Sequence, residues 1–216
     1  MDIKAVLFDF DYTLGDATDS IVAGFQYALT ALGWPKPDRE AVRATIGYML
    51  CDGYTMLTGD KDPEHIQRFL DLFAQRSRDM QIATTVLFPG AEALLQGLHD
   101  TGTKLGVVSS KRSAMLEPVL ERLGIRPLLD LVIGGDMVSA PKPDPEGLNR
   151  ALELLQLAPR DLLFCGDTVL DAGAAQRAGT RFCAVLNGVT PAEAFSSYPC
   201  DHISPDLWDL KAWLGA

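Results

Sequence analysis

Positive charge is scarce in this chain of 216 residues. Its 19 Lys and Arg are outnumbered by 29 Asp and Glu, which gives a formal net charge of -10 at pH 7. Proteins that bind nucleic acid or anionic membrane surfaces attract them with an excess of basic side chains. We therefore expect no nucleic acid and no membrane as a partner. A small phosphorylated substrate remains compatible with this composition, because one lysine and a metal ion can reverse the field inside a single cleft.

Cysteine pairs and histidine clusters are missing as well. The four cysteines show no Cys-x-x-Cys spacing, and the three histidines lie far apart in the sequence. This pattern argues against a zinc site and favours reduced thiols in a cytoplasmic protein. The sequence has neither a basic amino-terminal segment followed by a long apolar run nor an apolar run long enough to cross a membrane. We expect no signal peptide and no membrane span.

What the sequence does contain begins with a short apolar run that ends in two aspartates. Residues 5–8 are too few for a helix and favour a strand that is buried on both faces of a parallel sheet. Asp9 follows this strand, and Asp11 lies two residues further on. Ligands of open α/β sheets bind beyond the carboxyl ends of the strands, so both carboxylates could act on one bound group. Taken alone, the pair is equally compatible with a turn residue beside a solvated acid.

Residues 16–83 have a different pattern. Their apolar residues recur at helical spacing, and Asp62-Pro63-Glu64 is a strong signal for the start of a helix. No strand-like apolar run interrupts this segment. We predict that residues 16–83 form an all-helical cap domain, inserted after the first strand, and that residues 1–15 and 84–216 form the core domain.

Strand and helix patterns alternate from Pro89 onward. Apolar runs at 104–108, 131–133, 162–165 and 181–186 predict strands, with a further short strand near His202 and helices between them. This alternation is typical of a parallel sheet with right-handed crossovers. The predicted fold class is α/β, a doubly wound Rossmann-like parallel sheet with an inserted all-helical cap domain.

Polar residues follow several of the predicted strands, and in a parallel sheet these ends meet at one edge. The residues concerned are Asp9, Asp11, Ser109, Ser110, Lys111, Lys142, Asp167 and Asp171. Crowded carboxylates repel one another unless a cation lies between them, and Mg²⁺ suits carboxylate ligands beside a substrate phosphate. Lys142 and Ser109 could then bind the phosphate. Each residue alone also has an ordinary role as a cap or a solvated turn residue, but their convergence favours a site.

Four segments together resemble the haloacid dehalogenase-like hydrolase superfamily, in its phosphoglycolate phosphatase-like branch with a helical cap. The segments are Asp9 to Leu14, Val107 to Lys111, Pro141 to Pro145 and Gly166 to Asp171. The match spans essentially the whole chain. Two positions depart from the usual pattern, since Tyr12 replaces a Gly and Ser109 replaces a Thr. The linker of residues 15–17 also differs from the usual acidic-serine pair.

The resemblance implies a role for each matching residue. Asp9 would be the nucleophile that becomes an aspartyl phosphate, and Asp11 the general acid and base. Mg²⁺ would be held by Asp9, the backbone carbonyl of Asp11 and Asp167, with Asp171 completing or orienting the shell. Lys142 and Ser109 would hold the phosphoryl oxygens. Further substrate contacts are expected from Ser110, Lys111, Arg43, Gly47 and Tyr48, of which Gly47 belongs to a loop that closes over the site.

The resulting hypothesis is a Mg²⁺-dependent phosphatase that acts on a small phosphorylated metabolite, either phosphoglycolate-like or a sugar phosphate. A phosphomutase similar to β-phosphoglucomutase is the alternative, since the motifs do not separate the two. A catalytically silent phosphate-binding module is a further alternative from another class. A dehalogenase is not favoured, because Asp11 serves no purpose in halide displacement. We expect a monomer or a weak homodimer.

Overall fold

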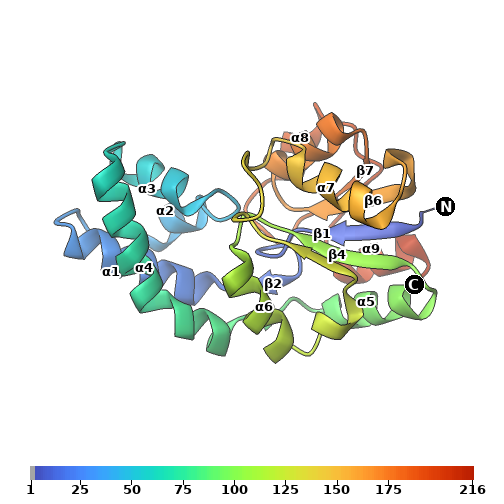
Figure 1. Cartoon of the computed structure of the whole chain (residues 1–216), viewed down its shortest axis with the longest axis horizontal. Helices are drawn as coiled ribbons and strands as arrows, with labels where there is room; N and C mark the ends of the chain where they lie inside the picture. The colour runs from blue at the N-terminus through green and yellow to red at the C-terminus, as the bar shows by residue number, and fades with distance from the viewer. Residues whose placement is uncertain (1–2) are drawn as a thin grey trace.

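The computed structural model describes residues 3–216. The predicted core begins at residue 1, so its first two residues lie outside the described part. Figure 1 shows a sheet flanked by helices and, beside it, a group of helices made by α1 to α4. We call α1 to α4 the helical segment. Both termini lie at the end of the molecule remote from this segment (Figure 1).

The sheet contains six strands in the order β5-β4-β1-β6-β7-β8 within the described residues. The strands are β1 Ala5–Phe8, β4 Lys104–Val108, β5 Leu131–Ile133, β6 Leu162–Gly166, β7 Arg181–Val185 and β8 His202–Ser204. Every neighbouring pair is parallel. Phe8 at the end of β1 lies opposite Val107 and Cys165. The residues that follow β1, β4 and β6 therefore emerge side by side.

Helices cover both faces of this sheet, as Figure 1 shows. Successive side chains of β1 point to opposite faces of the sheet, and each face has its own apolar core. Val6 and Phe8 pack with α5, α6 and α9, whereas Ala5 and Leu7 pack with α7 and α8. These helices are α5 Ala91–Asp100, α6 Ser113–Arg122, α7 Glu146–Leu155, α8 Val169–Ala178 and α9 Leu207–Leu214, with short 3₁₀ turns at Arg126–Leu128, Pro159–Asp161 and Ala192–Phe195. The predicted doubly wound parallel sheet is confirmed.

The helical segment has an apolar core of its own. It consists of α1 Thr18–Ala31, α2 Arg39–Arg43, α3 Leu50–Thr58 and α4 Pro63–Thr84. The centroid of the Phe69 ring lies 5.1 Å from that of Phe25 and 5.0 Å from that of Tyr54, so α1, α3 and α4 meet at one aromatic cluster. The start of α4 lies where the sequence predicts it, with the Asp62 side chain accepting a hydrogen bond from the Glu64 backbone.

A second, two-stranded sheet lies where the chain enters and leaves the helical segment. Gly15 and Asp16 form β2, which pairs in antiparallel fashion with β3, Val86–Leu87. The sequence analysis does not predict this pair, because two residues are too few to show a period of two. This pairing joins the two chain segments that connect the helical segment to the rest of the molecule. Within residues 3–216, no helix is both long enough and apolar enough to cross a membrane.

Candidate active site

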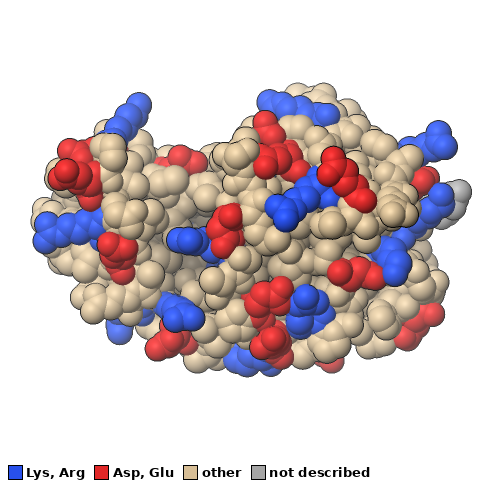
Figure 2. All heavy atoms as spheres, in the orientation of Figure 1, with Lys and Arg blue, Asp and Glu red and all other residues tan. Residues whose placement is uncertain are grey.

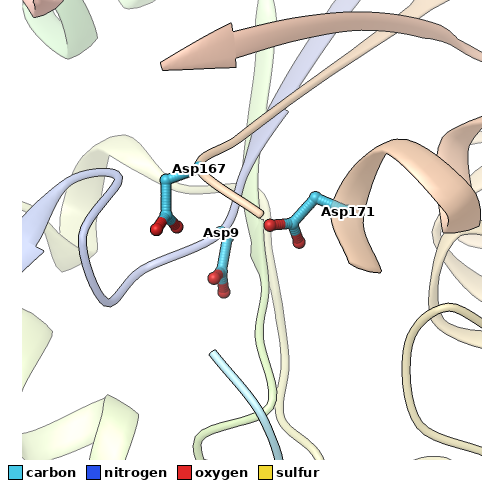
Figure 3. A group of neighbouring side chains, drawn as sticks. All are labelled: Asp9, Asp167 and Asp171. Carbon is cyan, nitrogen blue, oxygen red and sulfur yellow. The ribbon is translucent and has the colours of Figure 1, made fainter. Parts of the chain in front are cut away.

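Three carboxylates from two strand ends meet at the edge of the sheet. Asp9 follows β1, Asp167 follows β6, and Asp171 lies in the first turn of α8 (Figure 3). A ligand oxygen from each lies within 4.8 Å of the other two, and all three side chains are buried. Asp9 continues the parallel pairing of β1 with β6, because its backbone N–H donates to the Cys165 carbonyl at 2.9 Å. Strand geometry thus brings these acids together.

The electrostatics of this cluster leave it short of positive charge. Burial raises the pKa of Asp9 to about 6, with Lys142 opposing this effect and Asp171 adding to it. Burial and the neighbouring Asp171 and Asp9 also raise the pKa of Asp167 well above its usual range. Within residues 3–216, the buried Asp9 Oδ1 and Asp11 Oδ1 accept no hydrogen bond, although the ammonium group of Lys142 lies 3.1 Å from Asp9 Oδ1. A hard divalent cation fits this donor set, since it binds carboxylate oxygens and removes their repulsion.

Lys142 is the cation that the described chain supplies to the cluster. Its Nζ lies 2.6 Å from Asp171 Oδ1 and 3.1 Å from Asp9 Oδ1, and its side chain is only 7% exposed. Although burial lowers the pKa of Lys142, the carboxylates of Asp171 and Asp9 raise it above its usual range. Lys142 is therefore positively charged at neutral pH and bridges two of the three acids.

Asp171 is fixed by the start of its own helix. Its Oδ2 accepts hydrogen bonds from the backbone N–H and the hydroxyl of Thr168, at 3.0 and 2.6 Å, in a capping box. Its Oδ1 is the atom paired with Lys142. A Cβ at Gly166 would collide with the Asp171 side chain, so this close approach requires a glycine. Because both Asp171 oxygens already have partners, orienting the cluster suits this residue better than direct coordination.

Asp167 has supporting residues that the sequence analysis missed. The Thr13 hydroxyl donates to Asp167 Oδ1 at 3.3 Å, and Asn187 donates from its side chain to the Thr13 carbonyl at 3.1 Å. Gly188 lies so close to Asp167 that a Cβ there would collide with the carboxylate. Thr13 belongs to the first motif and could have been found there. Asn187 and Gly188 follow β7, where no motif singles them out.

The second motif connects the sheet to the helical segment. Ser109 is buried, and its hydroxyl accepts a hydrogen bond from the Lys111 backbone at 3.3 Å. The Ser110 hydroxyl donates to the Gly47 carbonyl at 2.8 Å. Lys111 Nζ lies 3.1 Å from Asp11 Oδ2 and donates to Gln81 Oε1 of α4 at 2.5 Å. The lysine predicted to contact substrate thus links the second aspartate of the first motif to α4.

A cavity of about 410 Å³ lies between the sheet edge and the helical segment. Of the predicted site residues, those that line it are Asp9, Asp11, Gly47, Tyr48, Ser109, Ser110 and Lys111. Lys142 instead lines a small neighbouring cavity together with Ser109. Asp167 and Asp171 lie outside both sets of lining residues. Asp9 and Asp11 therefore face the large cavity, whereas the other two carboxylates of the cluster do not.

Arg43 is directed to Tyr12 instead of this cavity. The Arg43 Nε donates to the Tyr12 hydroxyl at 3.1 Å, and its Nη1 lies 2.9 Å from Glu40 Oε2. Tyr12 has a φ of 63°, the left-handed region in which glycine is favoured, which accounts for the glycine usual at this position. Thr18 also donates to the Tyr12 hydroxyl, at 2.9 Å. Contact between Arg43 and a leaving group stays a prediction, and Arg43 is not among the residues that line the cavity.

Acidic and basic side chains are interspersed on the face of the molecule shown in Figure 2. They form no continuous basic field on that face, in keeping with the excess of Asp and Glu over Lys and Arg in the sequence.

Comparison with known proteins identifies the family. The haloacid dehalogenase-like hydrolase family matches residues 6–185. A phosphoglycolate phosphatase of Nitrosospira multiformis is 30% identical over 96% of this chain and 93% of its own length, and one of Salmonella typhimurium is 32% identical over 99% and 93%. The crystal structure of a haloacid dehalogenase-like hydrolase from Bacteroides fragilis superposes with a TM-score of 0.93 at 34% identity, covering 96% of this chain and 99% of that one. As the motifs predicted, the chain belongs to the haloacid dehalogenase-like hydrolase family, in its phosphoglycolate phosphatase-like branch.

Proposed function

We propose that this phosphatase is Mg²⁺-dependent and hydrolyses a small phosphorylated metabolite through an aspartyl phosphate on Asp9. The family and the phosphoglycolate phosphatases related to the chain support the phosphatase class. The observation that carries the mechanism is the position of Asp9. Its carboxylate is buried and lines the cavity, and the carboxylate of Asp11 lines the same cavity two residues later.

The metal would be held by Asp9 and Asp167, together with the backbone carbonyl of Asp11, while Asp171 orients the cluster. The raised pKa values of Asp9 and Asp167 support a cation at this place, and so does the absence of a hydrogen bond to Asp9 Oδ1. When bound, Mg²⁺ neutralises charge on the phosphoryl oxygens and on the carboxylates beside them. The ion pair between Lys142 and Asp9 keeps the carboxylate turned toward the cluster.

In the first step a carboxylate oxygen of Asp9 attacks the phosphorus, and the bond from phosphorus to the leaving oxygen breaks. Asp11 gives a proton to that oxygen, so the product leaves as a neutral alcohol. In the second step the deprotonated Asp11 takes a proton from water, whose oxygen attacks the phosphorus and breaks the bond to Asp9. Inorganic phosphate is released and both residues return to their starting states. Lys142 and the Ser109 hydroxyl hold the phosphoryl oxygens during both steps.

The helical segment, predicted as a cap over residues 16–83, would close the cavity. Two contacts between the sheet and this segment support the proposal, one from Ser110 to the Gly47 carbonyl and one from Lys111 to Gln81. Gly47 has a φ of 101° and packs against Thr168, whose Cγ2 would lie 2.8 Å from an added Cβ. This loop therefore approaches the strand end that carries Asp167 more closely than a larger residue would allow.

The direct test is release of inorganic phosphate from a panel of phosphoglycolate, sugar phosphates and other phosphate monoesters, with Mg²⁺ and with EDTA. We expect turnover of at least one compound with Mg²⁺ and loss of turnover with EDTA. Equal rates under both conditions would contradict the metal requirement. Isomerisation of a sugar phosphate without net phosphate release would favour the phosphomutase alternative.

Mg²⁺ is also expected to stabilise the fold, and more so at neutral than at acidic pH. A ligand at about 100 times its Kd stabilises the folded state by about 2.7 kcal/mol. Burial raises the pKa of Asp9 from 3.8 to about 6, so the cost of ionised Asp9 to folding grows between these two pH values and is fully present above pH 6, where Mg²⁺ relieves it. Below pH 6 a bound proton competes with the metal. Thermal unfolding at about pH 7.5 and about pH 5 measures the effect; an equal gain in Tm at both would contradict it.

A further inference from the structure

The part of the cavity that would hold the leaving group is lined mainly by apolar side chains of the helical segment. Ile21 and Phe25 come from α1, Leu70 and Phe73 from α4, and Met49 from the loop before α3. The cavity volume of about 410 Å³ lies in the range of roughly 300–1,000 Å³ that is typical of pockets for drug-sized ligands. The cavity is therefore larger than a two-carbon leaving group requires.

Cations are missing from the lining that the helical segment provides. Among its described residues, the lining set includes no Lys, Arg or His. The core contributes two cations. Lys111 is already paired with Asp11 and bound by Gln81, and Arg112 is exposed to solvent. A carboxylate that lies against Phe25 and Phe73 would therefore lose water at a part of the lining where the helical segment supplies no cation, which is costly.

The polar side chains of α4 that line the cavity are also occupied. Ser77 donates to the Phe73 carbonyl at 2.8 Å and accepts a hydrogen bond from the Gln81 amide at 3.1 Å. The side-chain oxygen of Gln81, Oε1, accepts a hydrogen bond from Lys111. These groups satisfy one another, so they favour an apolar neighbour over a ligand rich in hydroxyl groups.

We propose that the substrate is a phosphate monoester of an uncharged alcohol with an apolar or aromatic body. This inference rests on the proposed function, since it assumes that Asp9 attacks the phosphate of a molecule bound in this cavity. The phosphate would lie at Asp9 and Ser109, and the apolar body would pack against the side chains of α1 and α4 that line the cavity. Phosphoglycolate, the substrate in the names of the relatives, would be a poor substrate for this chain.

Matched alkyl phosphates test the proposal, because their leaving oxygens differ little in reactivity. The compounds are 2-phenylethyl phosphate, phosphoglycolate and glycerol 3-phosphate, each assayed with Mg²⁺. We expect kcat/KM for 2-phenylethyl phosphate to exceed that for phosphoglycolate by about tenfold or more, since even one methylene in an apolar pocket is worth about 10–200-fold. Equal values, or a preference for phosphoglycolate, would overturn the proposal.

A positive charge placed in the cavity should weaken this preference. Ala74 is exposed on α4 and lines the cavity, so Ala74→Arg adds a cation there without disturbing the aromatic cluster. We expect kcat/KM to fall for 2-phenylethyl phosphate and to rise for phosphoglycolate, changing their ratio about tenfold. The matched control is Gln75→Arg, which adds the same charge at the next exposed position, outside the lining. It should leave both values within about twofold. An unchanged ratio in Ala74→Arg would count against the proposal.

Calorimetry separates this inference from the proposed function. Binding of 2-phenylethyl phosphate and phosphoglycolate to the wild-type protein with Mg²⁺ is measured if neither compound is hydrolysed, and to Asp9→Asn otherwise. Tighter binding of 2-phenylethyl phosphate without turnover would support the inference and contradict the phosphatase mechanism. Turnover together with tighter binding of phosphoglycolate would support the phosphatase mechanism and contradict the inference about the substrate. Absence of binding by either compound would overturn the inference.

Discussion

Replacing Asp9 with asparagine is expected to lower kcat by about 10⁴-fold or more, because the amide cannot form the bond to phosphorus. The fold should persist. Asp9 is buried, its pKa is raised by that burial, and it lies beside two other buried carboxylates, so a neutral residue of the same shape removes repulsion. The measurements are phosphate release with Mg²⁺ on the best substrate and thermal unfolding of the same preparation.

The control for Asp9→Asn is Asp79→Asn, which makes the same chemical change at an exposed position of α4 outside the cavity lining. It should leave kcat within about twofold. A kcat of Asp9→Asn within about tenfold of the wild-type value would contradict covalent catalysis at this residue. Loss of the folded state in Asp9→Asn would instead mean that its carboxylate stabilises the cluster, against the expectation from its raised pKa.

Replacing Lys142 with methionine is expected to lower the free energy of unfolding by about 3–5 kcal/mol at neutral pH, as is usual when one partner of a buried ion pair is removed. Asp9 and Asp171 would each lose the ammonium group that lies 3.1 and 2.6 Å away. The deficit should shrink as the pH falls, because protonation removes the unpaired negative charges. Denaturant unfolding at several pH values measures both effects, and phosphate release should be lost as well.

Lys104→Met is the matched control for Lys142→Met. Lys104 forms an ion pair of 2.7 Å with Asp130, but its side chain is 56% exposed. Exposed pairs of this kind contribute about 0–1 kcal/mol, so this variant should remain close to wild type in stability. If both variants lost the same free energy, burial would not be what makes the Lys142 pairs important.

The residues that follow the strands could be predicted to lie together, because the carboxyl ends of parallel strands meet at one edge of the sheet. The predicted strands 104–108 and 131–133 coincide with β4 and β5, and β1 lies between β4 and β6 in the sheet. Asp9, Ser109 and Asp167 each follow one of the strands β1, β4 and β6, so the predicted strand ends already indicate that the three residues lie near one another. Lys142 lies in a loop, outside any helix or strand, so its place near the cluster could be predicted only from the third motif.

Side-chain directions in the helical segment could not be predicted in the same way. Arg43 donates hydrogen bonds to Tyr12 and Glu40, and these partners could not be predicted. Helical periodicity indicates which face is buried but not where a long, half-buried side chain is directed. The contact between Lys111 and Gln81 likewise joins two segments 30 positions apart in the sequence. Gly188 carries no local pattern at all, and only its closeness to Asp167 reveals why a larger residue is excluded.

The most direct test of the account is to trap the phosphorylated enzyme. The wild-type protein is mixed with Mg²⁺ and the best substrate, quenched in acid during turnover and treated with borohydride, which reduces an aspartyl phosphate to homoserine. Peptide mass analysis then locates the change. The account predicts homoserine at residue 9, where the sequence has Asp9, and none in protein that received no substrate. Rapid turnover without modification at this position, or modification at another carboxylate, would contradict it.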